Sequence, residues 1–551
     1  MALPDQALPA SSFQNRFLQV LSLLLASCVS LPIFVIILQW GTLGNGEQVI
    51  WQHLFDTKLG RLAGNTLILV LGVGAGVTLL GVSLAWLTSV CEFPGRRMFE
   101  WALMLPMAIP GYVMAFVFLG LFSYAGPVQT GLRSWFGTDI WFPDIQSPGA
   151  VILVFSLVLY PYVFLLSRTA FLAQGRSTMD AARVLGLSPF AAFLKVAIPV
   201  ARPAIVGGVA LALMETLADF GAVNVFGYDT FTTAIYTSWS GLFNLTVAAQ
   251  LASLLLLFVA VAMTLEQYGR EHQRYTQNDR RKTARSYQLQ GPKAVAATLF
   301  CSLVLAIAFV VPVAQLLVWV SKNFATDLDS SYFEFFLHTI GLAAIAAVAT
   351  AVIALLLALG KRLAGSMGMR SWQQRAERLA TLGYALPGSV LAVGIMLTFN
   401  GVDRILASVF QVQSLLIGSV FALLLAYVIR FLAVAHAPVE AGLLGIRPSV
   451  IEAARSLGAS PSRVLREVYV PMLKPGLFTA LLIVFVDVMK EMPATLMVRP
   501  FGWDTLAVRV FQMTNEGQWE RAALPALTLL LVGLVPVILL VKNSRFMPRG
   551  C

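Results

Sequence analysis

The strongest constraint on this chain is a series of about twelve apolar windows, each about 20 residues long. A helix of that length crosses the roughly 30 Å hydrocarbon core of a bilayer, so each window predicts one transmembrane helix. The apolar runs are continuous rather than alternating, which favours helices over a β-barrel and predicts an all-α membrane protein. The windows lie near residues 18–40, 63–90, 98–123, 149–171, 202–220, 243–265, 294–320, 337–360, 378–399, 412–434, 476–497 and 522–541.

A polar segment between two of these windows occurs twice. STMDAARVLGLSPFAAFLKVAIPVARP begins at Ser177, and SVIEAARSLGASPSRVLREVYVPMLKP begins at Ser449. The two copies align without a gap, and we call the alignment of Ser177 with Ser449 the repeat register. The repeat predicts two halves of six spans each, residues 1–265 and 294–551, joined by a polar, basic cytoplasmic linker at 266–293. An even number of spans in each half makes the two repeats parallel rather than inverted.

Each copy of the repeat predicts a helix, a turn and a second helix. A Ser-x-x-acid pattern is typical of a capped helix start, and a later glycine can take the left-handed conformation that ends the helix. A Ser-Pro pair then begins the second helix, and a further proline is expected to end it. These positions are Ser177, Asp180, Gly186, Ser188, Pro189 and Pro199 in the first copy, and Ser449, Glu452, Gly458, Ser460, Pro461 and Pro471 in the second.

The segments DAARVLG and EAARSLG resemble the EAA loop of permease subunits of ABC importers. The resemblance covers essentially the whole chain and implies the type I ABC importer permease fold. In that family the loop forms a coupling helix that docks into a groove on the ATP-hydrolysing subunit, which places coupling loops at 177–200 and 449–472. The residues that the resemblance assigns to coupling are Asp180, Ala181, Ala182, Gly186, Glu452, Ala453, Ala454 and Gly458.

The distribution of Lys and Arg predicts the orientation. If the repeated loops face the cytoplasm, most of the basic residues lie on that side, together with both termini. The resemblance to ABC importer permeases implies that the membrane is the bacterial inner membrane. Its net charge of +11 is then mainly a topology signal, and a nucleic-acid partner is not expected because the charges are dispersed among the spans.

Two acidic pairs lie in the spans that follow the coupling loops, and they align with each other in the repeat register. Each pair has i, i+4 spacing, which predicts one shared helix face. Ionisable residues inside spans usually face a bundle interior, a partner or a water-filled path. A direct role in the substrate path and a structural role, with Lys490, Arg168 or Arg430 as the neutralising cation, both remain open. The four candidate pathway residues are Glu215, Asp219, Asp487 and Glu491.

The runs LADFGAVNVFGYDTFTTAIY and KEMPATLMVRPFGWDTLAVRV resemble the fused, two-domain permeases of ferric-iron importers. Thiamine permeases share the fused plan without the first run, so thiamine or another small solute is the alternative substrate. The resemblance implies that two copies of a cytoplasmic ATP-binding cassette subunit dock on the chain. It also implies a periplasmic, or tethered external, substrate-binding protein.

Motifs for ATP hydrolysis and for metal binding are not visible in the sequence. The chain lacks a G-x-x-x-x-G-K-[ST] phosphate loop, so it is expected to be no enzyme, to hold no cofactor and to leave ATP to the partner subunit. Its four histidines are scattered, no metal site is assigned, and His338 and His436 are expected to be packing or loop residues. An ion-driven secondary transporter, with the carboxylates as cation sites, is less favoured because it needs no docking loop.

Overall fold

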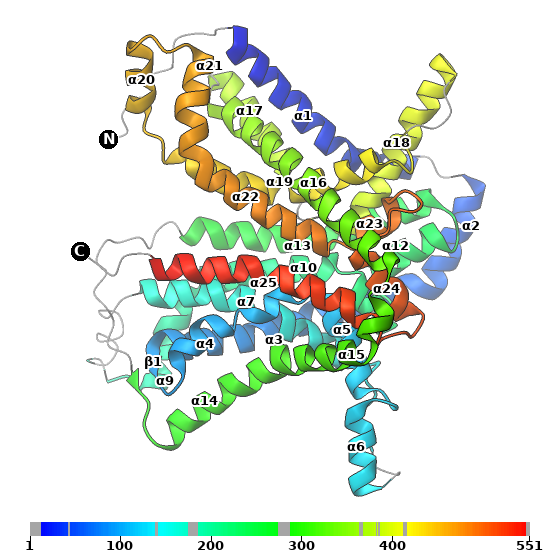
Figure 1. Cartoon of the computed structure of the whole chain (residues 1–551), viewed down its shortest axis with the longest axis vertical. Helices are drawn as coiled ribbons and strands as arrows, with labels where there is room; N and C mark the ends of the chain where they lie inside the picture. Colours follow the sequence, from blue (N-terminus) through cyan, green and yellow to red (C-terminus); the bar gives the residue numbers. More distant parts are fainter. Residues whose placement is uncertain are drawn as a thin grey trace. The chain divides into compact units, whose positions relative to one another are not determined.

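The computed structural model describes residues 13–41, 44–137, 141–174, 184, 186–273, 287–362, 367–381, 383, 386–411 and 416–546. Within these ranges eleven helices are long and apolar enough to cross a membrane, and the twelfth window contains a shorter apolar stretch, Ala523–Leu539. The helices of the spans are α1 (Phe13–Leu38), α3 (Gly60–Val90), α5 (Gly111–Phe122), α7 (Pro148–Ala173), α10 (Ile198–Ala218), α13 (Leu245–Gln273), α14 (Pro292–Leu305), α15 (Val311–Asp327), α16 (Ser330–Arg362), α18 (Gly388–Phe410), α19 (Val420–Leu444), α22 (Val470–Lys490) and α25 (Ala523–Phe546) (Figure 1). The all-α membrane fold is confirmed.

Shorter helices connect the spans. They are α2 (Asn45–Leu54), α4 (Arg96–Ala102), α6 (Pro127–Phe136), α9 (Pro189–Ala192), α11 (Gly221–Val225), α12 (Phe231–Ser240), α17 (Met367–Thr381), α20 (Pro448–Ser456), α21 (Pro461–Val464), α23 (Pro493–Val498) and α24 (Leu506–Asn515). One parallel pair of two-residue strands, β1 (Cys91–Glu92) and β2 (Tyr287–Gln288), adds a small exception to the helical fold. β2 lies in the predicted linker, and α13 continues into the same linker as far as Gln273.

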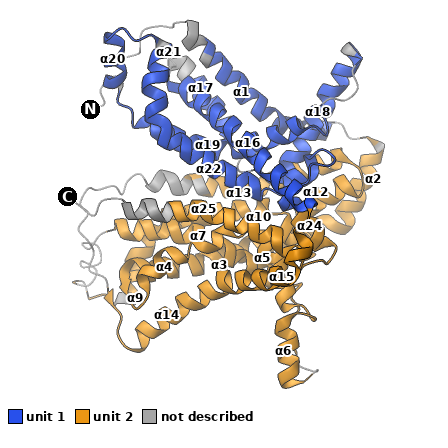
Figure 2. Cartoon of the chain, in the orientation of Figure 1, with its two compact units in different colours: residues 1–43, 330–508 blue, residues 44–329, 509–551 orange. Residues whose placement is uncertain are grey.

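One compact unit consists of residues 1–43 and 330–508 (Figure 2). In this unit α1 packs against α16, α17 and α18, while α19 packs against both α16 and α22. Tyr427 of α19 is fully buried, and its hydroxyl lies 2.7 Å from the hydroxyl of Thr495. Pairing of these two hydroxyls satisfies polar groups that cannot reach water.

The other compact unit consists of residues 44–329 and 509–551. Its most extensive helix–helix interface is between α3 and α7, where glycines let the two helices approach closely. A Cβ atom on Gly76 would lie 2.1 Å from Ser156 Oγ, and one on Gly81 would lie 2.6 Å from Val163 Cβ. Small residues at such contacts are typical of membrane helices, whose association depends on close packing rather than on the hydrophobic effect.

The compact units do not follow the order of the chain. α1 lies in the first sequence half but packs with helices of the second, whereas α14, α15 and α25 lie in the second half but belong to the unit built on the first. The apolar windows are hydrophobic on all sides, so they predict spans but not which spans pack together. The division at 1–265 and 294–551 therefore stays a prediction about the repeat in the sequence.

Several prolines act differently from the prediction. Pro199 and Pro471 do not end helices: a π-helical turn, Phe193–Ala197 or Leu465–Tyr469, precedes each of them, and α10 or α22 then continues. A proline ring crowds the carbonyl of the residue four positions earlier, here within the π turn, and the wider turn accommodates it. Pro110 and Pro387 are the N-cap residues at which α5 and α18 begin.

Candidate functional site

The second copy of the repeat folds as a helix, a glycine turn and a second helix. Gly458 has a φ of +80°, and its N–H donates to the carbonyl of Arg455 at 2.9 Å, while the N–H of Ala459 donates to that of Ala454 at 3.0 Å. These two bonds form a Schellman motif that satisfies the last carbonyls of α20. Nothing lies within 4 Å of a Cβ placed on Gly458, so the positive φ rather than lack of space requires glycine.

The start of α20 differs from the prediction. Ser449 does not cap this helix, because α20 begins one residue earlier at Pro448, with Arg447 as the N-cap residue and no side-chain hydrogen bond to the cap. Proline suits the first helical position, where its missing N–H costs no hydrogen bond. Glu452, Ala453 and Ala454 lie within α20, and the first two are exposed.

The described part of the first copy has the same left-handed glycine and serine cap. Gly186 has a φ of +79°, and Ser188 Oγ accepts a hydrogen bond from the N–H of Ala191 at 3.2 Å. In the second copy Ser460 Oγ accepts from the N–H of Arg463 at 3.4 Å. Both serine caps and both left-handed glycines are confirmed, whereas Ser177, Asp180, Ala181 and Ala182 lie outside the described residues.

We call the turns at Gly186 and Gly458 the coupling turns, after the role that the resemblance predicts for them. Each leads into a long helix, which we call a rod. The first rod is the continuous helix Phe193–Ala218 and the second is Ser462–Lys490, with 26 and 29 residues. At 1.5 Å per residue the rods are about 39 and 44 Å long. Each rod therefore joins a coupling turn to the acidic pair at its other end.

The acidic pairs lie at the ends of the rods rather than on one helix face. Asp219 and Glu491 each follow the last helical residue, with extended ψ angles of 128° and 116°. Asp219 Oδ1 accepts from the N–H of Ala222, and Glu491 Oε1 accepts from that of Ala494, both at 2.7 Å. Each carboxylate thus begins the next helix, α11 or α23, because amides at a helix N-terminus bind negative charge.

Each of these carboxylates also lies against the start of a second helix. A Cβ atom on Gly111, the first residue of α5, would lie 2.8 Å from Asp219 Oδ2, and one on Gly388, the first residue of α18, would lie 2.7 Å from Glu491 Oε1. A side chain at either glycine would collide with the carboxylate. We call these two sites, each built around one carboxylate and two helix starts, the first joint (Asp219) and the second joint (Glu491).

The second joint includes a cation. Arg430 Nε lies 3.2 Å from Glu491 Oε2, and its Nη1 donates to the carbonyl of Leu386 at 3.1 Å. Glu491 is only 6% exposed, whereas Asp219 is half-buried. Arg168 pairs with Glu100 rather than with a candidate pathway residue. The two remaining candidates, Glu215 and Asp487, are half-buried one turn before the end of each rod.

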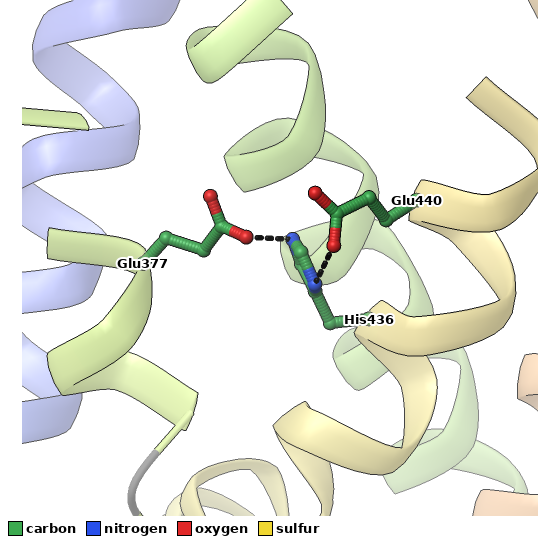
Figure 3. A group of neighbouring side chains, drawn as sticks. All are labelled: Glu377, His436 and Glu440. Atoms are coloured by element: carbon green, nitrogen blue, oxygen red, sulfur yellow. Dashed lines mark ion pairs between the residues drawn. The ribbon is translucent and has the colours of Figure 1, made fainter. Parts of the chain in front are cut away.

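A cluster of charged side chains lies near the ends of α16, α17 and α19. Lys361 Nζ lies 2.9 Å from Glu377 Oε2 and 2.6 Å from Glu440 Oε1, and His436 lies between the two carboxylates (Figure 3). We call Lys361, Glu377, His436 and Glu440 the α19 cluster. The neighbouring Arg362 donates to the carbonyls of Leu443 and Ile446, the second at 2.6 Å, and so connects α16 to the segment before α20.

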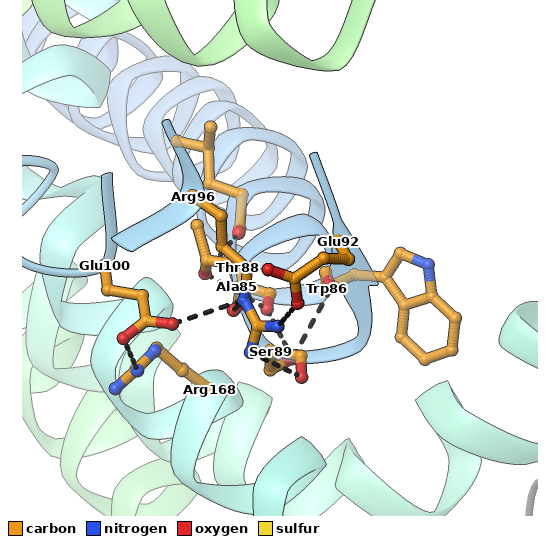
Figure 4. A network of polar contacts seen from close by, with 9 residues as sticks. Ala85, Trp86, Thr88, Ser89, Glu92, Arg96, Glu100 and Arg168 are labelled. Carbon is orange, nitrogen blue, oxygen red and sulfur yellow. Dashed lines mark hydrogen bonds and ion pairs between the residues drawn. The ribbon is translucent and has the colours of Figure 1, made fainter. Parts of the chain in front are cut away.

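The first half has a different network at equivalent positions. Arg168 of α7 pairs with Glu100 of α4 at 3.2 Å, and Arg96 pairs with Glu92 and Glu100 (Figure 4). In the repeat register Arg168 aligns with Glu440. Glu100 aligns with Glu377 in the slightly shifted register that also aligns the prolines before α5 and α18.

A buried thiol lies beside this network. Burial raises the pKa of Cys91 to about 11, against the opposing influence of Arg96. The thiol therefore stays protonated at neutral pH and adds no charge to the network.

Sequence reasoning missed the α19 cluster because its members come from three helices. The expectation that His436 only packs is incomplete: it is buried, and Nε2 lies 3.5 Å from Glu377 Oε1. The signal was the i, i+4 spacing of His436 and Glu440 inside an apolar window. His338 instead stacks on Trp503 at 4.7 Å, as expected for a packing residue.

Comparisons with known proteins agree with the duplicated architecture. The Fe(3+)-transport system permease protein FbpB 2 of Haemophilus influenzae is 26% identical over 536 residues, which cover 96% of this chain and 98% of that protein. The probable ABC transporter permease protein y4fN of Sinorhizobium fredii is 24% identical over 87% of this chain and 86% of its own length. The molybdenum transport system permease protein ModB of Escherichia coli is 29% identical over 26% of this chain and 62% of its own length.

The family comparison covers both halves. One family model, described as the binding-protein-dependent transport system inner membrane component, matches residues 77–268 and again residues 358–546. Each match contains one coupling turn, one rod and one joint. With two matches over more than half of its length, this multi-pass chain belongs to the family of inner-membrane components of binding-protein-dependent transport systems, as a fused permease with two copies of the family domain.

Proposed function

We propose that this chain is the transmembrane permease of an ATP-driven importer that moves ferric iron into the cytoplasm. The observation that carries the importer assignment is an exposed turn on the end of a long helix: Leu457, next to Gly458, is 86% exposed. Val184, two residues before Gly186 in the first copy, is 88% exposed, so both copies present an apolar side chain that a docking partner would cover. The choice of iron rests on likeness to the Haemophilus influenzae Fe(3+)-transport permease over 96% of the chain.

The two coupling turns are the docking sites for two copies of a cytoplasmic ATP-binding cassette subunit. Small residues and one acid on each turn would enter a groove on that subunit, and the subunit, not this chain, would bind and hydrolyse ATP. A substrate-binding protein would deliver the substrate on the outer face, with both termini on the cytoplasmic side. The coupling residues are Asp180, Ala181, Ala182 and Gly186 in the first copy and Glu452, Ala453, Ala454 and Gly458 in the second.

The rods transmit movement from the turns to the joints. A packed, hydrogen-bonded helix is stiff, so a displacement of Gly458 by the ATPase subunit is carried along Ser462–Lys490 to Glu491. At the joint the chain changes direction, since α22 ends and α23 begins. Asp219 and Glu491 then hold the joints together, while Glu215 and Asp487, one turn nearer the cytoplasm, are the carboxylates offered to the substrate path. Oxygen ligands of this kind suit a hard cation such as Fe³⁺.

Uptake of radiolabelled ferric iron tests the proposal. Cells with and without this chain are compared, each with excess thiamine or excess molybdate as competitor. Loss of iron uptake on deletion, insensitive to both competitors, is the expected result. Iron uptake that persists in a strain without other iron routes would contradict the ferric assignment, and competition by thiamine would support the small-solute alternative.

A further inference from the structure

The α19 cluster contains a set of side chains that could bind a metal ion. Among the described residues, Glu377, His436 and Glu440 are the one group of three such side chains whose ligand atoms all lie within 4.8 Å of one another. They converge from α17 and α19, as Figure 3 shows. His436 Nε2 and Glu377 Oε1 are 3.5 Å apart. Two ligands of a tetrahedral ion with bonds of about 2.1 Å are separated by about 3.4 Å.

His436 has a buried nitrogen without a hydrogen bond. The residue is only 4% exposed, and its Nε2 atom makes no hydrogen bond to any described residue. A buried polar atom without a hydrogen bond is destabilising and calls for an explanation. Nε2 faces a carboxylate oxygen, which is also the usual companion of an imidazole in a metal site.

The ammonium of Lys361 lies where a bound metal cation would contact both carboxylates. It lies within 3.0 Å of both Glu377 and Glu440. Two carboxylates and one ammonium together carry one net negative charge in a half-buried position. A divalent ion would bind both carboxylates and the imidazole at once, whereas the ammonium of Lys361 donates to the two carboxylates and leaves His436 Nε2 without a hydrogen bond to any described residue.

We propose that Glu377, His436 and Glu440 form a binding site for a divalent first-row transition-metal ion, with Lys361 as a tethered cation that competes for the same carboxylates. Mixed oxygen and imidazole ligands suit this class of ion. The side chains of Glu440 and Lys361 are about one-third exposed, so an ion can reach the site without unfolding. Lys361 precedes Arg362, which contacts the segment before α20, so occupancy is expected to alter the second coupling turn; that consequence alone rests on the proposed function.

The first half of the chain supplies the control positions. In the repeat register Phe164 and Arg168 align with His436 and Glu440. An aromatic ring cannot bind a metal ion, and a guanidinium repels one. The exchanges His436→Phe and Glu440→Arg therefore introduce the side chains that occupy the aligned positions of the first half. There the arginine, Arg168, is paired with Glu100.

The test is equilibrium binding of Zn²⁺ alone to the full chain in lipid nanodiscs. We expect one zinc site that H436F and E440R each weaken by about ten-fold or more and that K361M tightens. E100Q, at the position equivalent to Glu377, should leave zinc binding unchanged. Size-exclusion profiles and melting temperatures identify any variant that fails to fold, in which case the other variant decides.

Two results would overturn the proposal. Zinc binding that is the same in wild type, H436F and E440R would show that these side chains do not bind the ion. If K361M leaves the zinc affinity unchanged or weakens it, Lys361 does not compete with the metal ion. Neither result depends on transport, so failure of the metal site would leave the proposed importer function untouched.

Discussion

The two joints have the same backbone plan but different electrostatics. Each has a carboxylate that accepts a hydrogen bond at the start of one helix and lies against the first glycine of another. Glu491 is buried and paired with Arg430, whereas Asp219 is half-buried and Val158 aligns with Arg430 in the repeat register. Burial takes the carboxylate of Glu491 out of water, and the adjacent guanidinium of Arg430 offsets part of that cost.

The comparison predicts that the second joint is much more sensitive to loss of its carboxylate. Glu491→Ala would leave Arg430 buried without its partner, which costs about 3–5 kcal/mol. Asp219→Ala would remove a helix cap, which costs about 0.5–2 kcal/mol. Urea or thermal unfolding of the purified variants in one detergent measures both effects.

A double variant separates the buried charge from the cap. Arg430→Met combined with Glu491→Leu removes both charges, so it should be less destabilising than Glu491→Ala by itself. Equal losses for Asp219→Ala and Glu491→Ala would mean that Arg430 does not distinguish the joints.

A second difference between the halves concerns the support of the coupling turns. Arg362 donates to two carbonyls before α20, and Val90 aligns with it in the repeat register. Arg362→Ala should lower the free energy of unfolding by about 1.5–3 kcal/mol, the range for hydrogen bonds to a charged group. It should also lower substrate transported per ATP hydrolysed in reconstituted vesicles. The exposed Arg378 is the matched control, and an equal effect of Arg378→Ala would remove the special role of Arg362.

The turns themselves are expected to behave alike, because Gly186 and Gly458 share the same left-handed conformation. Gly458→Val forces a β-branched residue into that conformation at a cost of about 1–3 kcal/mol, and uptake should fall while membrane insertion persists. Gly458→Asn is the matched control, since Asn tolerates the left-handed region, and it should retain most uptake. Wild-type uptake by Gly458→Val, measured beside Gly186→Val, would argue against a rigid docking turn.

The predictability of the structure from sequence follows from how local each feature is. The windows locate the spans because a bilayer imposes length and apolarity on each helix separately. The left-handed conformation of Gly458 and the N-cap role of Ser460 are predictable because a helix end and a cap depend on a few adjacent residues. The continuation of the helix past Pro471 is not predictable from the sequence, since the π turn that accommodates the proline ring has no distinctive residue of its own. The α19 cluster forms only through packing of three helices, which apolar windows leave unspecified.

The smallest expected effect concerns charge on the surface of the turns. Arg463 and Glu467 form an ion pair of 2.9 Å after the second turn, and Ala191 and Lys195 occupy these positions in the first. Both partners are more than half exposed, so solvent screens the pair and its loss should change stability by less than about 0.5 kcal/mol. Arg463→Ala, which matches the first copy, should therefore leave the unfolding transition in place and reduce uptake less than Gly458→Val does. If Arg463→Ala reduced uptake more than Gly458→Val, the ATPase subunit would recognise the second turn by its charges rather than by the glycine geometry that both turns share.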